Sequence, residues 1–183
     1  MKTTYHQFGI VLLFCLLTFS QCTKHADKPQ TDYLFPETQT GMGTFSCLVD
    51  GQAFIPYTAQ RAMNPSQAYY GIKNGKYSFI ISSHNHADPT NLAITLYGDT
   101  LNMAPGIYPL NAPPVGLMFG ASYDVDNNSN TTTYTTSTVN SGELHITRLD
   151  SGIASGTFWF DAQDNVTKKV VQIRRGQFDL NYR

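Results

Sequence analysis

The stretch that most constrains the fold lies at residues 141–182, where three runs alternate between apolar and polar side chains. Leu144 and Ile146 fall on one side of the first run, and polar residues separate them. A repeat of two residues is typical of a β-strand with one buried face. We therefore expect three successive antiparallel strands, at 142–149, 153–160 and 170–182.

The second and third of these runs add a constraint on shape. Phe158 and Phe160 share one face of the second run. In the third run, Ile173 and Phe178 are an odd number of positions apart, so they cannot share a face in a regular strand. A β-bulge at Gly176 would restore the phase, and bulges also bend a sheet, as a barrel or a coiled sandwich requires.

Four motifs in the chain resemble an uncharacterised family of small all-β lipoproteins from Bacteroidota. They are GELHIT at 142–147, SGTFWF at 155–160, IRRGQFD at 173–179 and FSCLVDGQAF at 45–54. The resemblance covers most of the mature chain. It implies architecture and location, and it brings no catalytic residues with it.

Further strands precede the closing three. Asp50-Gly51 and Asn74-Gly75 are two-residue hairpin signals, each flanked by apolar runs. Polar loops are expected at 84–88 and 161–169. The expected strands are 44–50, 52–55, 59–63, 68–73, 76–83, 92–97, a short piece at 107–108, 119–125 and the second half of 126–140. Together they predict an all-β domain over 43–183 with about ten strands, either a single antiparallel, meander-rich β-barrel of calycin type or a β-sandwich.

The N-terminus reads as a targeting segment. Residues 8–19 are apolar, which is too short for a membrane span of ~20 residues, and Ser20 and Gln21 then lead into Cys22. This pattern resembles a bacterial lipobox and predicts a signal peptide at 1–21 and acylation of Cys22. The alternative is an ordinary secretory signal with an incidental cysteine. Residues 22–42 are mostly polar and lack periodicity, so we expect a flexible tether. Tyr33, Leu34 and Phe35 are the exception, and they could either dock on the body or lie loose.

Composition narrows the classes of partner. The formal net charge is −1, so there is no basic excess to attract nucleic acid. If Cys15 leaves with the leader and Cys22 carries lipid, Cys47 has no partner for a disulfide, and it is predicted to be a small buried residue. Thr100, in an Asp-Thr-Leu sequence that resembles an O-glycosylation acceptor in Bacteroidota, is a candidate for this modification.

Two clusters have the composition of metal sites. His84, His86 and Asp88 would lie on one side of a continuing strand, and two imidazoles with a carboxylate suit zinc. The alternative is a polar loop. Asp124, Asp126 and Asn128 alternate like the start of a calcium loop, without the glycine or the closing glutamate, and the alternative there is a solvated hairpin loop.

Three further side chains are candidates for binding a ligand. Trp159 and Tyr182 would suit an aromatic-lined cavity, although core packing or surface exposure is the more common reason for such residues. Arg174, with its neighbour Arg175, would suit an anion, although such arginines are more often exposed charges on a strand face.

These features lead to three hypotheses. The first is a non-enzymatic lipoprotein of the cell envelope, held in the lipid bilayer of an outer membrane by Cys22, that needs no cofactor and binds a small molecule or an envelope protein. The second is an assembly component that acts through an exposed edge strand. The third is a metal-dependent enzyme that uses His84 and His86.

Overall fold

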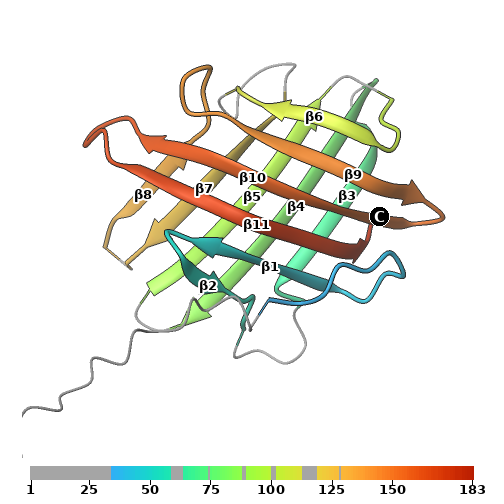
Figure 1. The fold of residues 1–183 in the computed structure, drawn as a ribbon, viewed down its shortest axis with the longest axis horizontal. Coiled ribbons are helices and arrows are strands. Elements are labelled where there is room, and N and C mark those ends of the chain that lie inside the picture. Colours follow the sequence, from blue (N-terminus) through green and yellow to red (C-terminus); the bar gives the residue numbers. More distant parts are fainter. Residues whose placement is uncertain are drawn as a thin grey trace, which may run out of the picture.

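The computed structural model of the protein describes residues 34–58, 64–73, 75–87, 90–99, 102–112, 119–127 and 129–183. Within them the chain forms one antiparallel sheet of 11 strands and no helix, which confirms the all-β prediction (Figure 1). The strands are β1 (Thr44–Val49), β2 (Gln52–Phe54), β3 (Ser66–Lys73), β4 (Lys76–Ala87), β5 (Thr90–Asp99), β6 (Gly106–Leu110), β7 (Gly120–Asp126), β8 (Thr131–Thr135), β9 (Gly142–Asp150), β10 (Ile153–Asp164) and β11 (Val170–Asn181).

The sheet curls strongly into a half-barrel. Its strands follow the order β2-β1-β11-β10-β8-β7-β5-β4-β3, and β9 joins β10 on one side and β6 on the other. The long strand β10 makes the corner, because it pairs with β9 over most of its length and with β8 at Gln163 and Asp164. Figure 1 shows β9, β10, β11 and β1 crossing over the other arm of the sheet, formed by β3, β4, β5 and β7.

The core lies between the two arms and is filled by side chains of alternate residues. Phe158 and Phe160 both point into it, as their shared parity predicts, and each is at most 2% exposed. Phe45 packs against Phe158 with ring centroids 5.3 Å apart, so the first strand and the closing strands share one core. Burial of such aromatic rings dominates the stability of a small β domain.

The hairpins at the sheet edges form where the sequence predicts them. Asp50 and Gly51 have φ values of 49° and 83°, which is the backbone that a two-residue turn needs to match the twist of its strands. Ser151 and Gly152 repeat this geometry between β9 and β10. The pairing of Lys73 with Lys76 likewise confirms the hairpin predicted at Asn74-Gly75.

The predicted bulge in β11 is present, one step from its expected place. Phe158 pairs with Gly176, whereas Phe160 pairs with Ile173, so Arg174 and Arg175 together oppose one residue of β10. Arg175 has a positive φ of 51°. Gly176 follows it because a Cβ there would stand 2.4 Å from the ring of Phe158.

Two predicted loops are wrong in part, because polarity is not evidence against a strand when one face is in water. β4 continues through Ala87 and so contains residues 84–87, and β10 continues through Asp164 and so contains residues 161–164. The strand expected at 59–63 lies outside the described residues.

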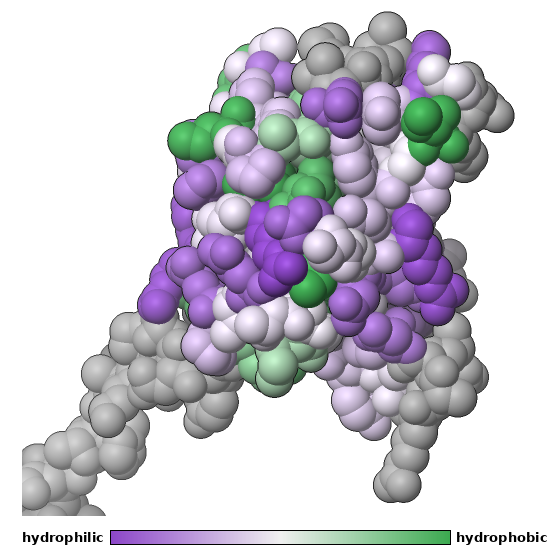
Figure 2. Space-filling model, turned by 90° about the vertical axis from the view of Figure 1, so that its right-hand side faces the viewer, coloured by the Kyte–Doolittle hydropathy of each residue, from purple (hydrophilic) through white to green (hydrophobic). Residues whose placement is uncertain are grey.

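The two arms also meet near the C-terminus. Arg183 N donates to Ala68 O, and Tyr70 N donates to Arg183 O, both at 3.3 Å, so the chain end covers part of the edge of β3. The side of the molecule that faces right in Figure 1 carries mainly polar residues, with small separate apolar groups (Figure 2).

Candidate functional site

The antiparallel register places two rows of side chains next to each other on the outer face of β9, β10 and β11. The first row crosses into β1 and consists of His145, Thr157, Gln177 and Ser46. In the second row, Glu143 pairs with Trp159, beside the bulge of β11. Directly paired residues have Cβ atoms ~4.5–5.5 Å apart, so each row is a continuous strip of side chains.

Residues 34–42, which we call the strap, lie against this face at β1 and β11. Phe35 N donates to Ser46 Oγ at 3.1 Å, and Gln177 Nε2 donates to the same oxygen at 3.2 Å. The sequence pattern places the strap in the flexible tether, whereas the structure shows it held to the sheet. Its partners on β11 lie more than a hundred positions later in the chain, which is why local polarity does not reveal them.

The carboxylate of Asp179 holds the strap. Asp179 lies on β11, is 1% exposed and accepts a hydrogen bond of 2.7 Å from Ser155 Oγ on β10. The strap donates four more, from Thr38 Oγ1 at 2.7 Å and from the backbone N–H groups of Thr40, Gly41 and Met42 at 3.0, 2.8 and 3.1 Å. A buried charge is tolerated here because its oxygens are surrounded by donors.

The same contacts set the ionisation of Asp179. Burial by itself favours the neutral acid, but the hydroxyls of Ser155 and Thr38 and the strap N–H groups outweigh it, so the pKa lies far below its ordinary value of 3.8. Asp179 is therefore a fixed negative charge in the folded protein at neutral pH. No sequence motif marks it.

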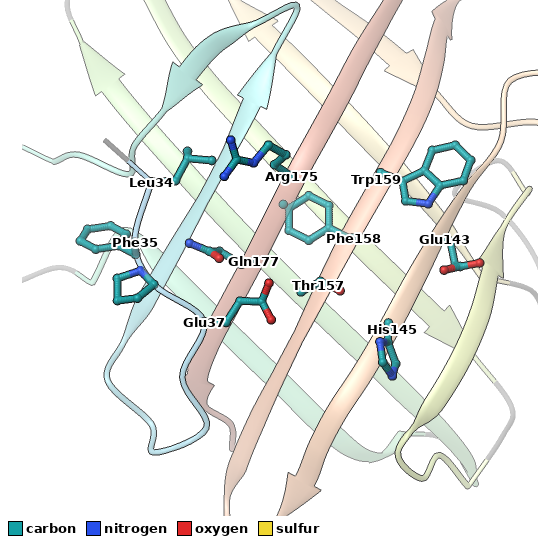
Figure 3. Close-up of a pocket in the computed structure, with 12 residues that line it drawn as sticks. Leu34, Phe35, Glu37, Glu143, His145, Thr157, Phe158, Trp159, Arg175 and Gln177 are labelled. Carbon is teal, nitrogen blue, oxygen red and sulfur yellow. The ribbon is translucent and has the colours of Figure 1, made fainter. Parts of the chain in front are cut away.

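A groove of about 610 Å³ runs between the strap and the two rows. Figure 3 shows Leu34 and Phe35 on the strap side, Trp159, Glu143 and His145 on the opposite side, and Glu37 pointing from the strap toward the middle. Pro36 of the strap also lines the groove. The remaining lining residues are Thr157, Phe158, Arg175, Gly176 and Gln177. The groove thus combines an exposed indole with carboxylates, a guanidinium, an imidazole and an amide.

Two of the predicted ligand-binding residues, Trp159 and Arg174, contact each other, and Trp159 lines the groove. The Arg174 guanidinium carbon lies 5.5 Å from the centre of the Trp159 ring. Arg174 in turn donates to Asp161 Oδ1 at 2.6 Å and to Phe160 O at 3.1 Å. Trp159, 42% exposed, is therefore held in place by a cation that is itself fixed to the sheet.

The third predicted ligand-binding residue, Tyr182, lies elsewhere. It packs edge-on against Tyr70 with ring centroids 5.7 Å apart and lines a separate cavity of about 460 Å³ beside β3. Its backbone bridges to Ala68. Tyr182 therefore links the two arms of the sheet and does not contribute to the groove.

His84 and His86 lie on the outer face of β4, on the other arm of the sheet. Their rings stack with centroids 5.5 Å apart and planes within 3° of parallel. His84 Nε2 is hydrogen-bonded to Ser82 Oγ at 2.9 Å, and His86 Nδ1 to Asn91 Oδ1 at 3.2 Å. Burial and the neighbouring His86 lower the pKa of His84, and Asp124 raises it to a smaller extent.

The carboxylates of the predicted calcium loop are strand residues. Asp124 and Asp126 belong to β7, and Asp124 accepts hydrogen bonds from Thr133 Oγ1 at 2.6 Å and Ser122 Oγ at 3.3 Å. Among the described residues, no group of three or more His, Cys, Asp or Glu side chains is placed to hold a metal ion.

Cys47 is fully buried in the core, as predicted, and its burial raises the pKa of the thiol. Four other predicted residues lie outside the described ranges: Cys22, Asp88, Thr100 and Asn128.

Sequence reasoning missed most of the groove. Glu143 and His145 are correctly predicted to face water, but nothing in the pattern shows that Gln177, Arg175 and the strap lie beside them. Their proximity depends on strand register between distant segments. The bulge predicted near Gly176 is the one feature of the local sequence that points to the groove, because it brings Arg175 to the outer face of the sheet.

Comparison with known proteins adds a family and no function. Searches of curated proteins and of solved structures found no match to the chain. Among the described residues, no helix is both long and apolar enough to cross a bilayer. Residues 65–179, more than half of the chain, match a family described as a domain of unknown function, DUF6252. The match begins just before β3 and ends at Asp179, and on this basis the chain belongs to the DUF6252 family.

Proposed function

We propose that this protein is a lipid-anchored binding protein of the cell envelope. We further propose that its ligand binds in the groove between the strap and the outer face of β9–β11. Acylated Cys22 would hold the body at the bilayer, since each buried methylene contributes ~0.8 kcal/mol. The groove is the single observation that carries the proposal, because it is concave and gathers aromatic and polar side chains from four separate segments.

The exposure of the groove favours reversible binding over a reaction. His145 and Arg175 are exposed and Glu143 is half-buried, so water reaches the polar groups. Closing a site against water strengthens the electrostatic interactions that assist a reaction, and an open groove lacks this advantage. An open groove therefore fits reversible binding better than a chemical step.

The groove is also preorganised. The bulge orients Arg175, Arg174 holds Trp159, and Asp179 fixes the strap before any ligand arrives. Groups that are already ordered lose little conformational entropy on binding, which raises affinity.

The alternative of assembly through an edge strand has weaker support. Arg183 already bonds to β3 at Ala68 and Tyr70, and β6 carries Pro109, which has no N–H to offer a neighbour. A metal-dependent reaction at His84 and His86 has less support still, because the two rings stack on a strand face and a ring nitrogen of each is hydrogen-bonded to the protein.

The anchor is tested by cell fractionation. Replacing Cys22 with alanine is expected to move the protein from the membrane fraction to the soluble fraction. Continued membrane association of the Cys22→Ala protein would refute the anchor.

The groove is tested by fluorescence, because Trp159 is the single tryptophan of the chain. We would titrate the protein with neutral oligosaccharides, short peptides, nucleotides, dicarboxylates and fatty acids. At least one class is expected to change Trp159 emission saturably. His145→Ala should weaken that binding, whereas His86→Ala, the same change at an exposed strand histidine outside the groove, should not. If no class gives a saturable change, the groove has no binding role.

A further inference from the structure

The groove has features that select one chemical class of ligand, and this inference rests on the proposed binding function. We infer that it binds a neutral, polyhydroxylated ligand, namely a short oligosaccharide laid across β9, β10 and β11. Three observations support this class: the spacing of the polar rows, the held indole and the balance of charge.

The rows present polar groups at the spacing of the strands. His145, Thr157 and Gln177 stand on three neighbouring strands in direct register. Adjacent strands lie ~4.7–4.9 Å apart, which is comparable to the length of one pyranose unit in a linear oligosaccharide. A chain of sugars placed along this row would meet one polar side chain for each ring.

The donors and acceptors along the row suit hydroxyl groups. A hydroxyl both donates and accepts, so it can pair with the amide of Gln177, the imidazole of His145 or the hydroxyl of Thr157. Gln177 already uses its Nε2 on Ser46, which fixes the orientation of the amide and leaves its oxygen directed elsewhere as an acceptor.

Trp159 supplies an apolar surface at one end of the groove. A pyranose ring has a face of C–H groups that packs on an aromatic ring, and an indole offers the largest such area. Arg174 holds the indole at 5.5 Å, and Trp159 is still 42% exposed. Glu143, its direct partner on β9, is placed to accept from hydroxyls at the edge of a stacked ring.

The charges in the groove argue against a strongly charged ligand. Glu37 and Glu143 bring negative charge, and Arg175 brings positive charge on the same face. An anion would meet the two carboxylates and a cation would meet the guanidinium. A neutral ligand avoids both penalties and can still bond to all three groups.

The test uses soluble trisaccharides of glucose, mannose, galactose, xylose and N-acetylglucosamine, in both α- and β-linked forms where they exist, titrated into the whole protein with Trp159 emission as the signal. At least one is expected to shift the emission saturably. Its dissociation constant, measured by calorimetry, should rise about tenfold in His145→Ala and in Gln177→Ala, as expected for one lost hydrogen bond to a ligand. The control His86→Ala should leave it unchanged.

The outcomes separate the ligand class from the binding role. If no trisaccharide binds but a peptide, nucleotide, dicarboxylate or fatty acid does so in a His145-dependent manner, the class is wrong and the groove remains a binding site. If a trisaccharide binds equally well to all three variants, the sugar site is not the groove, and the inference fails. If nothing binds, both proposals fall.

Discussion

Removing the carboxylate of Asp179 should destabilise the protein and release the strap. Asp179→Asn keeps the shape of the side chain but places an amide N–H₂ among donors that now point at a carboxylate. Hydrogen bonds to charged groups contribute ~1.5–3 kcal/mol each when measured singly, but they do not add. The strap N–H groups can return to water when the strap lifts, whereas Ser155, which is fully buried, cannot.

We therefore expect a loss of about 3 kcal/mol in the free energy of unfolding, equivalent to a fall in Tm of ~10 °C for a domain of this size. The assay is urea unfolding followed by circular dichroism at pH 7. The matched control is Asp150→Asn, which removes the same charge from a side chain that is 65% exposed and ion-paired with Arg148 on the surface, and it should lower the free energy of unfolding by under ~1 kcal/mol.

The pH dependence gives a second, independent test. Because folding lowers the pKa of Asp179, its contribution is fully present above the ordinary value of 3.8. Below that value the unfolded chain takes up the proton first, so the contribution falls progressively until the pH reaches the lower pKa of the folded protein. The difference in the free energy of unfolding between the wild type and Asp179→Asn should therefore shrink as the pH is lowered from about 5 to about 3. Hydrogen exchange at Thr40, Gly41 and Met42 should accelerate in Asp179→Asn at neutral pH.

Two results would refute this reasoning. One is a stability loss below ~1 kcal/mol, no larger than that of the exposed Asp150 control. The other is a difference in the free energy of unfolding between the wild type and Asp179→Asn that stays constant as the pH is lowered below 3.8.

Three other outcomes are expected. Gly176→Ala should lower the free energy of unfolding, measured in urea, by ~2 kcal/mol or more, because its methyl would stand 2.4 Å from the Phe158 ring. Gly106→Ala, whose methyl would have its nearest neighbour 3.9 Å away, should change that free energy by under ~0.5 kcal/mol. Equal effects of the two substitutions would contradict the packing argument. Elemental analysis of the purified protein should find no stoichiometric zinc or calcium, because His84 and His86 stack and bond to Ser82 and Asn91; one equivalent of either metal would overturn that assignment. Arg174→Met should lower the fluorescence anisotropy of Trp159, since the guanidinium that holds the indole is lost, and an unchanged value would mean that the cation does not restrain it.

Alternation and turn chemistry account for most of what could be predicted. Leu144, Ile146, Phe158 and Phe160 are buried because a strand repeats every two residues, and this rule acts within a few positions. The same rule revealed the phase break before Phe178. It failed at His84 and Asp161, because a polar residue on the outer face of a strand looks like a loop residue.

The candidate site could not be predicted in the same way. Trp159 and Arg174 were recognised as candidates, but the pattern also paired them with Tyr182, which lies at a different cavity. The sequence pattern did not identify Gln177 and His145 as binding residues, because a polar residue on the outer face of a strand is common and its neighbours on other strands are not visible in the sequence.

The amino-acid sequence by itself determined the places of most strands, the hairpin turns and the need for a bulge near Gly176, because each of these depends on residues that are close in the chain. Only the tertiary structure decided that the strap is held by Asp179, that the core is shared by β1 and β10, and that the groove lies outside the half-barrel. The physical reason is register: hydrogen bonds and side-chain contacts between segments more than a hundred residues apart form only when the whole sheet is assembled.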